Sequence, residues 1–285
     1  MKQQIKQFIQ LNLLYPLKRR QTQRKWHRQS YTGVPVVIGN AMPKSGSKLL
    51  EQILHGLTQL TPLVEYGLDS IRSITVDGRT RSQQEIEQDL MRLKPGDVVL
   101  TYLHATPVNQ SYLTRPNWAS YFIYRDPRDL LISHIFYAVD MNPNHAMHTY
   151  YQPLNMEERL RTAIQGIHQE NLNLPDVRTR YDRHLGWLSC PQVMSIRFEQ
   201  LVAERENILE KMLSHFEAAG GSLSISRSQA VQALLEAMDP KRSSTFRKGK
   251  SGGWKEYFSD KNKKLFKEVA GDLLIRLGYE VNNDW

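Results

Sequence analysis

The chain has 285 residues, of which 40% are hydrophobic and 24% charged, enough apolar material for one large core or two small ones. Its single cysteine, Cys190, excludes a disulfide within the chain and favours a reducing compartment. The sequence contains no apolar run of the roughly 18 residues that a membrane span needs, and its start lacks the apolar core of a signal peptide. We therefore expect a cytoplasmic protein.

The net charge of +9 is concentrated at the start of the chain. Residues 1–30 hold eight lysines and arginines and no acid, so the remainder carries about +1 (9 − 8). A nearly neutral body argues against nucleic-acid binding. Residues 2–15 have loosely helical apolar spacing, and we expect Pro16 to end that helix and 18–30 to be polar. This tail is either a helix packed on the domain before a solvated linker, or a weak anchor at a membrane surface.

From residue 31 onward the sequence predicts one α/β domain ending at 285. Short, largely apolar runs predict buried strands at 34–39, 97–103, 120–124 and 192–198. Helical segments separate the strands, at 48–60, from Pro127 after the capping residue Asp126, and after the last strand through about 216. The last quarter is predicted helical, with a loop at 239–253. Strands alternating with helices indicate a central parallel sheet flanked by helices.

The loop after the first strand has the composition of a phosphate-binding loop. Small residues there allow backbone N–H groups and the helix N-terminus to approach an anion, and two lysines add charge. The candidate donor-binding residues are Lys44, Ser45, Gly46, Ser47, Lys48 and Leu49. The alternative is an ATP-dependent, P-loop-type kinase of a nucleoside or small molecule. It ranks second because the spacing of the loop does not match the GxxxxGK[ST] motif of such kinases. An ordinary strand-to-helix turn is the plainer interpretation.

Two further segments offer cations. Arg125 stands at a strand end with Ser133 eight residues on, a combination able to bind a phosphate, although Arg125 could simply pair with Asp126 or Asp129. The segment 246–258 reads FRKGKSGGWKEYF and places Arg247 and Lys248 beside Gly249, which suits an anion or an exposed basic turn.

Taken together, these segments resemble the sulfotransferase family that uses 3′-phosphoadenosine 5′-phosphosulfate (PAPS), especially its cytosolic and bacterial members. The matching segments are PKSGSKL at 43–49, YLHATP at 102–107, Arg125 with Ser133, RFEQL at 197–201 and RKGKSGGWK at 247–255. They occur in family order over about 34–280. The resemblance implies a P-loop-like phosphosulfate-binding loop in an α/β fold, and transfer of a sulfuryl group to a hydroxyl or amine of a small-molecule, sugar or lipid acceptor.

The resemblance also implies roles for individual residues. His104 would be the general base, since an imidazole titrates near neutral pH, and Lys44 would stabilise the leaving phosphate. The backbone from Ser45 to Leu49 would hold the 5′-phosphate. The remaining cofactor-binding residues would be Arg125, Ser133, Phe198, Arg247, Lys248 and Gly249. No metal is implied.

The chain departs from the family pattern at four positions. Leu49 replaces the tryptophan near the adenine, Lys48 a threonine, Tyr102 a lysine and Gly253 an aspartate. These changes leave open how the adenine and part of the sulfate are held. The family's dimer motif is not matched around 258–267, so we expect no dimer through that interface. The oligomeric state is otherwise open, as is the acceptor. A non-catalytic anion-binding module, which would not need His104, remains a third alternative.

Overall fold

The computed structural model describes residues 9–66, 70–75, 78–170, 172–239, 242 and 251–285. They form two compact units that alternate along the chain. The first comprises Met1–Tyr124 and Trp187–Pro240, and the second comprises Arg125–Gly186 and Lys241–Trp285.

A parallel sheet is the centre of the first unit. In the described part of the chain its order is β2-β4-β1-β5-β8. The strand β3 also pairs with β4, farther along β4 than β2 does. All of its pairings are parallel, as the sequence predicts. The strands are β1 (Val36–Ala41), β2 (Val64–Glu65), β3 (Ile71–Arg72), β4 (Asp97–Tyr102), β5 (Trp118–Tyr124) and β8 (Val193–Arg197).

The four predicted strands are therefore present with shifted ends. The last one is shorter than expected, because Phe198 begins the helix α10 (Phe198–Ala203) instead of ending the strand. The sequence analysis did not foresee β2 and β3, which are two residues each and pair with opposite ends of β4. Runs this short carry no alternation that could be recognised.

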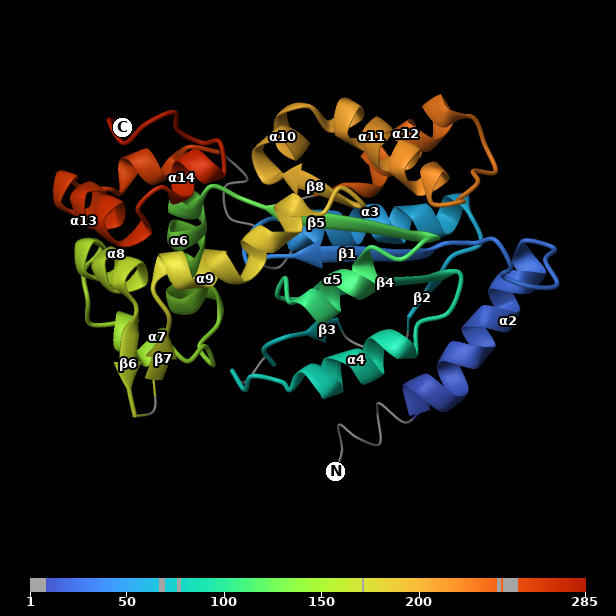
Figure 1. The fold of residues 1–285 in the computed structure, drawn as a ribbon, viewed down its shortest axis with the longest axis horizontal. Coiled ribbons are helices and arrows are strands. Elements are labelled where there is room, and N and C mark those ends of the chain that lie inside the picture. The colour runs from blue at the N-terminus through green and yellow to red at the C-terminus, as the bar shows by residue number, and fades with distance from the viewer. Residues whose placement is uncertain (1–8, 67–69, 76–77, 171, 240–241, 243–250) are drawn as a thin grey trace. The chain divides into compact units, whose positions relative to one another are not determined.

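Helices cover both sides of this sheet (Figure 1). The helix α3 (Ser47–Leu60) connects β1 toward β4, whereas α5 (Pro107–Leu113) connects β4 back across β1 to β5. Right-handed crossovers in opposite directions place these two helices on opposite faces. The other helices of the unit are α4 (Gln83–Met91), α11 (Arg205–Ala218) and α12 (Arg227–Ala237), with a 3₁₀ turn (Gly186–Ser189) at the boundary.

The basic tail is folded farther than predicted. A π-helical turn (Gln10–Leu14) runs into α2 (Tyr15–Lys25), so Pro16 does not end the helix. It stands in the first turn of α2, where proline's missing N–H costs no hydrogen bond. The buried Tyr15 hydroxyl donates to the Asp97 carboxylate at 2.6 Å, and Arg19 Nη1 lies 2.5 Å from it. These contacts anchor the tail helix to the first residue of β4.

The second unit is mainly helical. It opens with α6 (Pro127–Phe136), whose N-cap Asp126 accepts from the Arg128 N–H as the sequence predicts. Its core includes contacts of α13 with α8 and α9. The other elements are a π-helical turn (Tyr137–Met141), α7 (His148–Tyr151), α8 (Met156–Gln165), the hairpin β6 (Ile167–Gln169) and β7 (Leu172–Leu174), α9 (Val177–Leu185), a 3₁₀ turn (Gly253–Glu256), α13 (Asp260–Ala270) and α14 (Leu273–Arg276).

Candidate active site

The loop between β1 and α3 is built to bring backbone amides to a helix start. Lys44 has φ +68° and Gly46 has φ +98°, so the chain is left-handed at both positions just before α3. A lysine rarely adopts this conformation, and such backbone strain concentrates at functional sites. Gly46 is the N-cap of α3 and has no side chain to occupy the helix terminus. The N-terminus is thus open to an anion.

Hydrogen bonds within the loop decide which amides remain for a ligand. The Ser45 N–H donates to the Met42 carbonyl at 3.2 Å, and the Leu49 N–H donates to the Gly46 carbonyl at 3.0 Å. The buried Ser45 Oγ lies 2.6 Å from the Met42 carbonyl and 3.0 Å from that of Ile123. The Gly46, Ser47 and Lys48 amides stand at the start of α3, where a helix supplies no acceptor of its own.

Phe198 packs directly against this loop. A Cβ placed on Gly46 would lie 2.5 Å from Phe198 Cδ2 and 3.2 Å from Ile123 Cδ1. Only glycine leaves room for this contact. The structure thus brings together two predicted site residues that are more than 150 positions apart in the chain, because β8 ends beside β5 and the loop follows β1.

The Lys48 side chain forms an ion pair on the surface of α3. Its Nζ lies 2.7 Å from Glu51 Oε2 one turn along α3, with both side chains about half exposed. An exposed pair of this kind contributes little to stability. Its ammonium is engaged on the helix surface, whereas the Lys48 amide remains part of the helix start.

His104 follows β4, which lies next to β1 in the sheet, so the histidine and the loop leave adjacent parallel strands at the same edge. Ligands bind at this edge in open parallel sheets. The backbone of His104 is bonded on both sides: its N–H donates to Ser73 Oγ at 2.9 Å, and its carbonyl accepts from Asn109 Nδ2 at 2.9 Å.

The residue before His104 is held as firmly. Asn40 Oδ1 accepts from the Leu103 N–H at 2.8 Å, and the Leu103 carbonyl accepts from Trp187 Nε1 at 3.0 Å. Asn40 is fully buried in β1. Sequence analysis overlooked Ser73, Asn109 and Asn40, although the amide of Asn40 within the apolar run of β1 was a readable signal, because a buried polar group needs partners.

Arg125 is the first residue after β5 and belongs to the second unit. Its carbonyl accepts from the buried Tyr181 hydroxyl at 2.8 Å, and its Nη2 lies 3.8 Å from Asp129 Oδ2. Asp126 instead binds Arg128, which also contacts Glu280 at 2.5 Å. Ser133 lies within α6 and is half-buried.

Asp129 ties α6 to the C-terminal basic segment. Its carboxylate accepts from the Gly252 N–H at 2.8 Å and the Trp254 N–H at 2.9 Å. These residues immediately follow the predicted cation loop. Arg247, Lys248 and Gly249 themselves lie outside the described residues. Asp129 therefore holds the backbone of Gly252 and Trp254, whereas the sequence analysis considered it only as a partner for Arg125.

The described residues include no group of three or more His, Cys, Asp or Glu side chains arranged to hold a metal ion. Within those same ranges, no helix combines the length and apolarity needed to cross a membrane.

An open helix N-terminus after β1 and a histidine after the neighbouring strand thus stand at the carboxyl edge of a parallel α/β sheet, an arrangement that suits a phosphate-bearing ligand. The sequence profile described as "Sulfotransferase domain" matches residues 36–278. The chain therefore belongs to the sulfotransferase family and is an enzyme of sulfuryl transfer. Membership of this family favours sulfuryl transfer over the two alternatives that the sequence left open, a kinase and a non-catalytic anion-binding module.

Solved structures show the same fold. Mouse sulfotransferase SULT7A1 complexed with PAP is 17% identical, with a TM-score of 0.56 over 85% of this chain and 84% of that one. Retinol dehydratase in complex with androsterone and the inactive cofactor PAP is 14% identical, with a TM-score of 0.56 over 89% of this chain and 85% of that one. No curated protein matches this chain in sequence.

Proposed function

We propose that this enzyme takes the sulfuryl group from PAPS and transfers it to a hydroxyl or amine of a small-molecule, sugar or lipid acceptor. The proposal rests on one observation above all: the turn that is left-handed at Lys44 and Gly46 leaves the N-terminus of α3 open. This turn follows β1, and His104 follows the adjacent strand β4. The PAP in the two related structures supports the choice of donor.

The donor's 5′-phosphate would be bound by the Gly46, Ser47 and Lys48 amides, with Ser45 and Leu49 shaping the loop through their own bonds. Phe198, packed on Gly46, would line the same end of the nucleotide. Arg125 and Ser133 would bind the 3′-phosphate, together with Arg247, Lys248 and Gly249.

In the reaction, the acceptor oxygen or nitrogen attacks the donor's sulfur, a new bond to sulfur forms, and the bond from sulfur to the bridging phosphate oxygen breaks. The acceptor's proton passes to the His104 imidazole. Negative charge develops on the departing phosphate, where the Lys44 ammonium would stabilise it. The products are the sulfated acceptor and PAP, and no metal takes part in these steps.

Calorimetry with PAP and AMP tests the donor assignment. We expect PAP to bind at least tenfold more tightly than AMP, because a phosphate contact to charged side chains is worth about 1.5–3 kcal/mol, and we expect no dependence on magnesium. Equal affinities for PAP and AMP would contradict the proposal. ADP binding that requires magnesium would contradict it as well.

The tail supports a second proposal, weak contact of a cytoplasmic enzyme with an anionic membrane surface. Tyr15 and Arg19 anchor the tail helix to the domain, whereas the residues Ile9, Leu13, Leu14 and Leu17 are 41%, 57%, 43% and 51% exposed. Arg20 and Arg24 follow on the exposed side, and in the described residues neither pairs with an acid. Apolar and cationic groups together suit an anionic lipid surface.

Sedimentation with phosphatidylserine-containing vesicles at low salt tests this contact. We expect wild type to bind, and Leu13→Gln/Leu17→Gln and Arg20→Gln/Arg24→Gln to bind less. The control Lys261→Gln/Lys264→Gln removes the same charge from exposed positions of α13. Equal loss in the control, or no binding by wild type, would show that the tail is structural.

A further inference from the structure

Arg72 occupies a distinctive position at the end of β3. It is the register partner of Tyr102, the last residue of β4, and its guanidinium carbon lies 4.1 Å from the centroid of the Tyr102 ring. Neighbouring residues in register on parallel strands project from the same face of the sheet. The guanidinium therefore lies over the Tyr102 ring, and a cation in that position can still donate its N–H groups to a ligand.

The backbone next to Arg72 is joined to the catalytic histidine. Ser73, one residue on, donates its N–H to the Tyr102 carbonyl at 2.9 Å, and its Oγ accepts from the His104 N–H at 2.9 Å. The chain around Arg72 is held in turn by Arg81, whose N–H donates to the Ser73 carbonyl at 2.9 Å. Arg72 is thus fixed to the strand end that presents His104.

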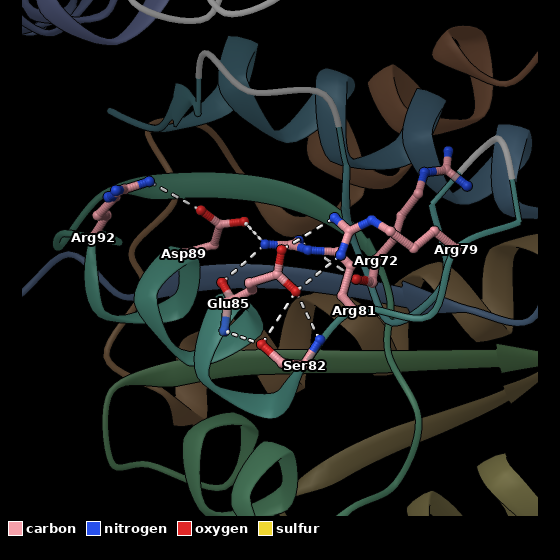
Figure 2. Close-up of polar contacts among 7 residues, drawn as sticks. All are labelled: Arg72, Arg79, Arg81, Ser82, Glu85, Asp89 and Arg92. Atoms are coloured by element: carbon pink, nitrogen blue, oxygen red, sulfur yellow. Dashed lines mark hydrogen bonds and ion pairs between the residues drawn. The ribbon is translucent and has the colours of Figure 1, made fainter.

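Every other arginine nearby has a carboxylate partner (Figure 2). Arg79 Nη2 lies 3.1 Å from Glu85, and Arg81 Nη2 lies 2.8 Å from Asp89. Arg92 Nη1 lies 3.0 Å from the same Asp89. Arg72 enters this cluster only through its backbone carbonyl, which faces Arg81 Nη1 at 3.5 Å. Among the described residues, no carboxylate pairs with the Arg72 guanidinium.

We propose that Arg72 binds an oxyanion at the reaction centre: either the oxygens of the sulfuryl group being transferred or an anionic group of the acceptor. A half-buried guanidinium that lies over an aromatic ring, and that has no acidic partner within the described ranges, suits bidentate recognition of such an anion. This proposal rests on the proposed function, because it takes His104 as the base beside which the anion lies.

The test compares wild type with Arg72→Gln, with Arg79→Gln as the matched control, which removes the same charge from the same segment at an exposed, paired position. Calorimetry measures PAPS and PAP, which differ by the sulfuryl group. Ligand-observed NMR on the PAP complex measures 4-hydroxybenzoate and phenol, which differ by a carboxylate. Arg72→Lys keeps the charge and should retain part of any effect.

If Arg72 binds the sulfuryl group, Arg72→Gln should weaken PAPS binding by about tenfold or more while leaving PAP binding unchanged. If it binds the acceptor's anion, the variant should lose preference for 4-hydroxybenzoate over phenol with both nucleotides unaffected. The proposal is overturned if Arg72→Gln matches Arg79→Gln in both arms while wild type binds PAP. Failure of wild type to bind PAP would instead overturn the proposed function, and this inference with it.

Discussion

The Oγ of Ser73 accepts a hydrogen bond from the backbone N–H of His104 at 2.9 Å, although the two residues are 31 positions apart. Ser73 is buried and continues β3, while His104 continues β4. The proposed general base is therefore held in position by the residue that directly follows the neighbouring strand.

Ser73→Ala should misplace His104 without removing it. We expect kcat to fall by about tenfold, because small displacements of a reacting group are costly, whereas His104→Ala should lose about 10²–10⁴-fold. Affinity for PAP should stay near wild type in both. Steady-state kinetics and calorimetry check this, with the exposed Ser111→Ala as control. A His104→Ala enzyme with near-normal turnover at pH 7 would refute the base assignment.

Lys44→Ala should lose turnover by a different route. The missing ammonium would no longer stabilise charge on the departing phosphate, so the variant should recover partly with a donor analogue that has a better leaving group. His104→Ala should show no such recovery. The measurement is the ratio of wild-type to variant kcat for PAPS and for the analogue. An unchanged ratio would remove Lys44 from the leaving-group role.

Arg125→Ala should weaken PAP binding by tenfold or more, the loss expected for a charge-assisted contact to the 3′-phosphate. AMP, which lacks that phosphate, should bind as it does to wild type. Ser133→Ala should act in the same direction by a smaller factor. Thermal melts check the stability of both variants, which should stay near that of wild type because the Asp129 bonds to the Gly252 and Trp254 amides involve neither substituted side chain. Equal loss of AMP and PAP would point to a disturbed fold instead.

Gly46→Ala should disrupt the donor loop. The alanine would have to adopt φ +98°, and its methyl group would lie 2.5 Å from Phe198 Cδ2. Donor binding should therefore be lost and the fold destabilised by about 1 kcal/mol or more. Gly33→Ala is the matched control, because Gly33 has φ +77° but no atom within 4 Å of an added Cβ. PAP binding equal in the two variants would show that the contact with Phe198 is unimportant.

Asp97 predicts a pH dependence of stability. Burial raises the pKa of its carboxyl from 3.8 to about 6, although Tyr15, Lys94 and Arg19 favour the ionised form. The folded protein then binds a proton between about pH 4 and 6 that the unfolded chain has lost, so stability falls as pH rises through this window and levels off above it. A pKa shift of about two units corresponds to a change of about 3 kcal/mol in the free energy of unfolding across this window.

Urea denaturation at pH 4 and pH 7 measures this effect. Asp97→Asn cannot ionise. The free energy of unfolding at pH 4 minus that at pH 7 should therefore be smaller for this variant than for wild type. The comparison removes the contributions of all other titrating groups. The same pH difference in both proteins would contradict the raised pKa.

Four of the six strands of the sheet, the α/β class, the order of the motifs and the family could be predicted from the sequence. The apolar run at 34–39 predicts a buried strand, which the structure has at 36–41, and the helix start at Pro127 is predicted from its neighbour Asp126. Local chemistry was sufficient wherever the partners lie a few residues apart.

Tertiary structure decided the rest. The tail helix is anchored to the domain because Asp97, on a distant strand, binds Tyr15 and Arg19. Gly46 is required because Phe198 packs on it, and the short β3 brings Arg72 and Ser73 to the end of β4. These contacts join segments far apart in the chain, and strands of two residues have no periodicity of their own, so only the pairing of the sheet places those residues beside His104.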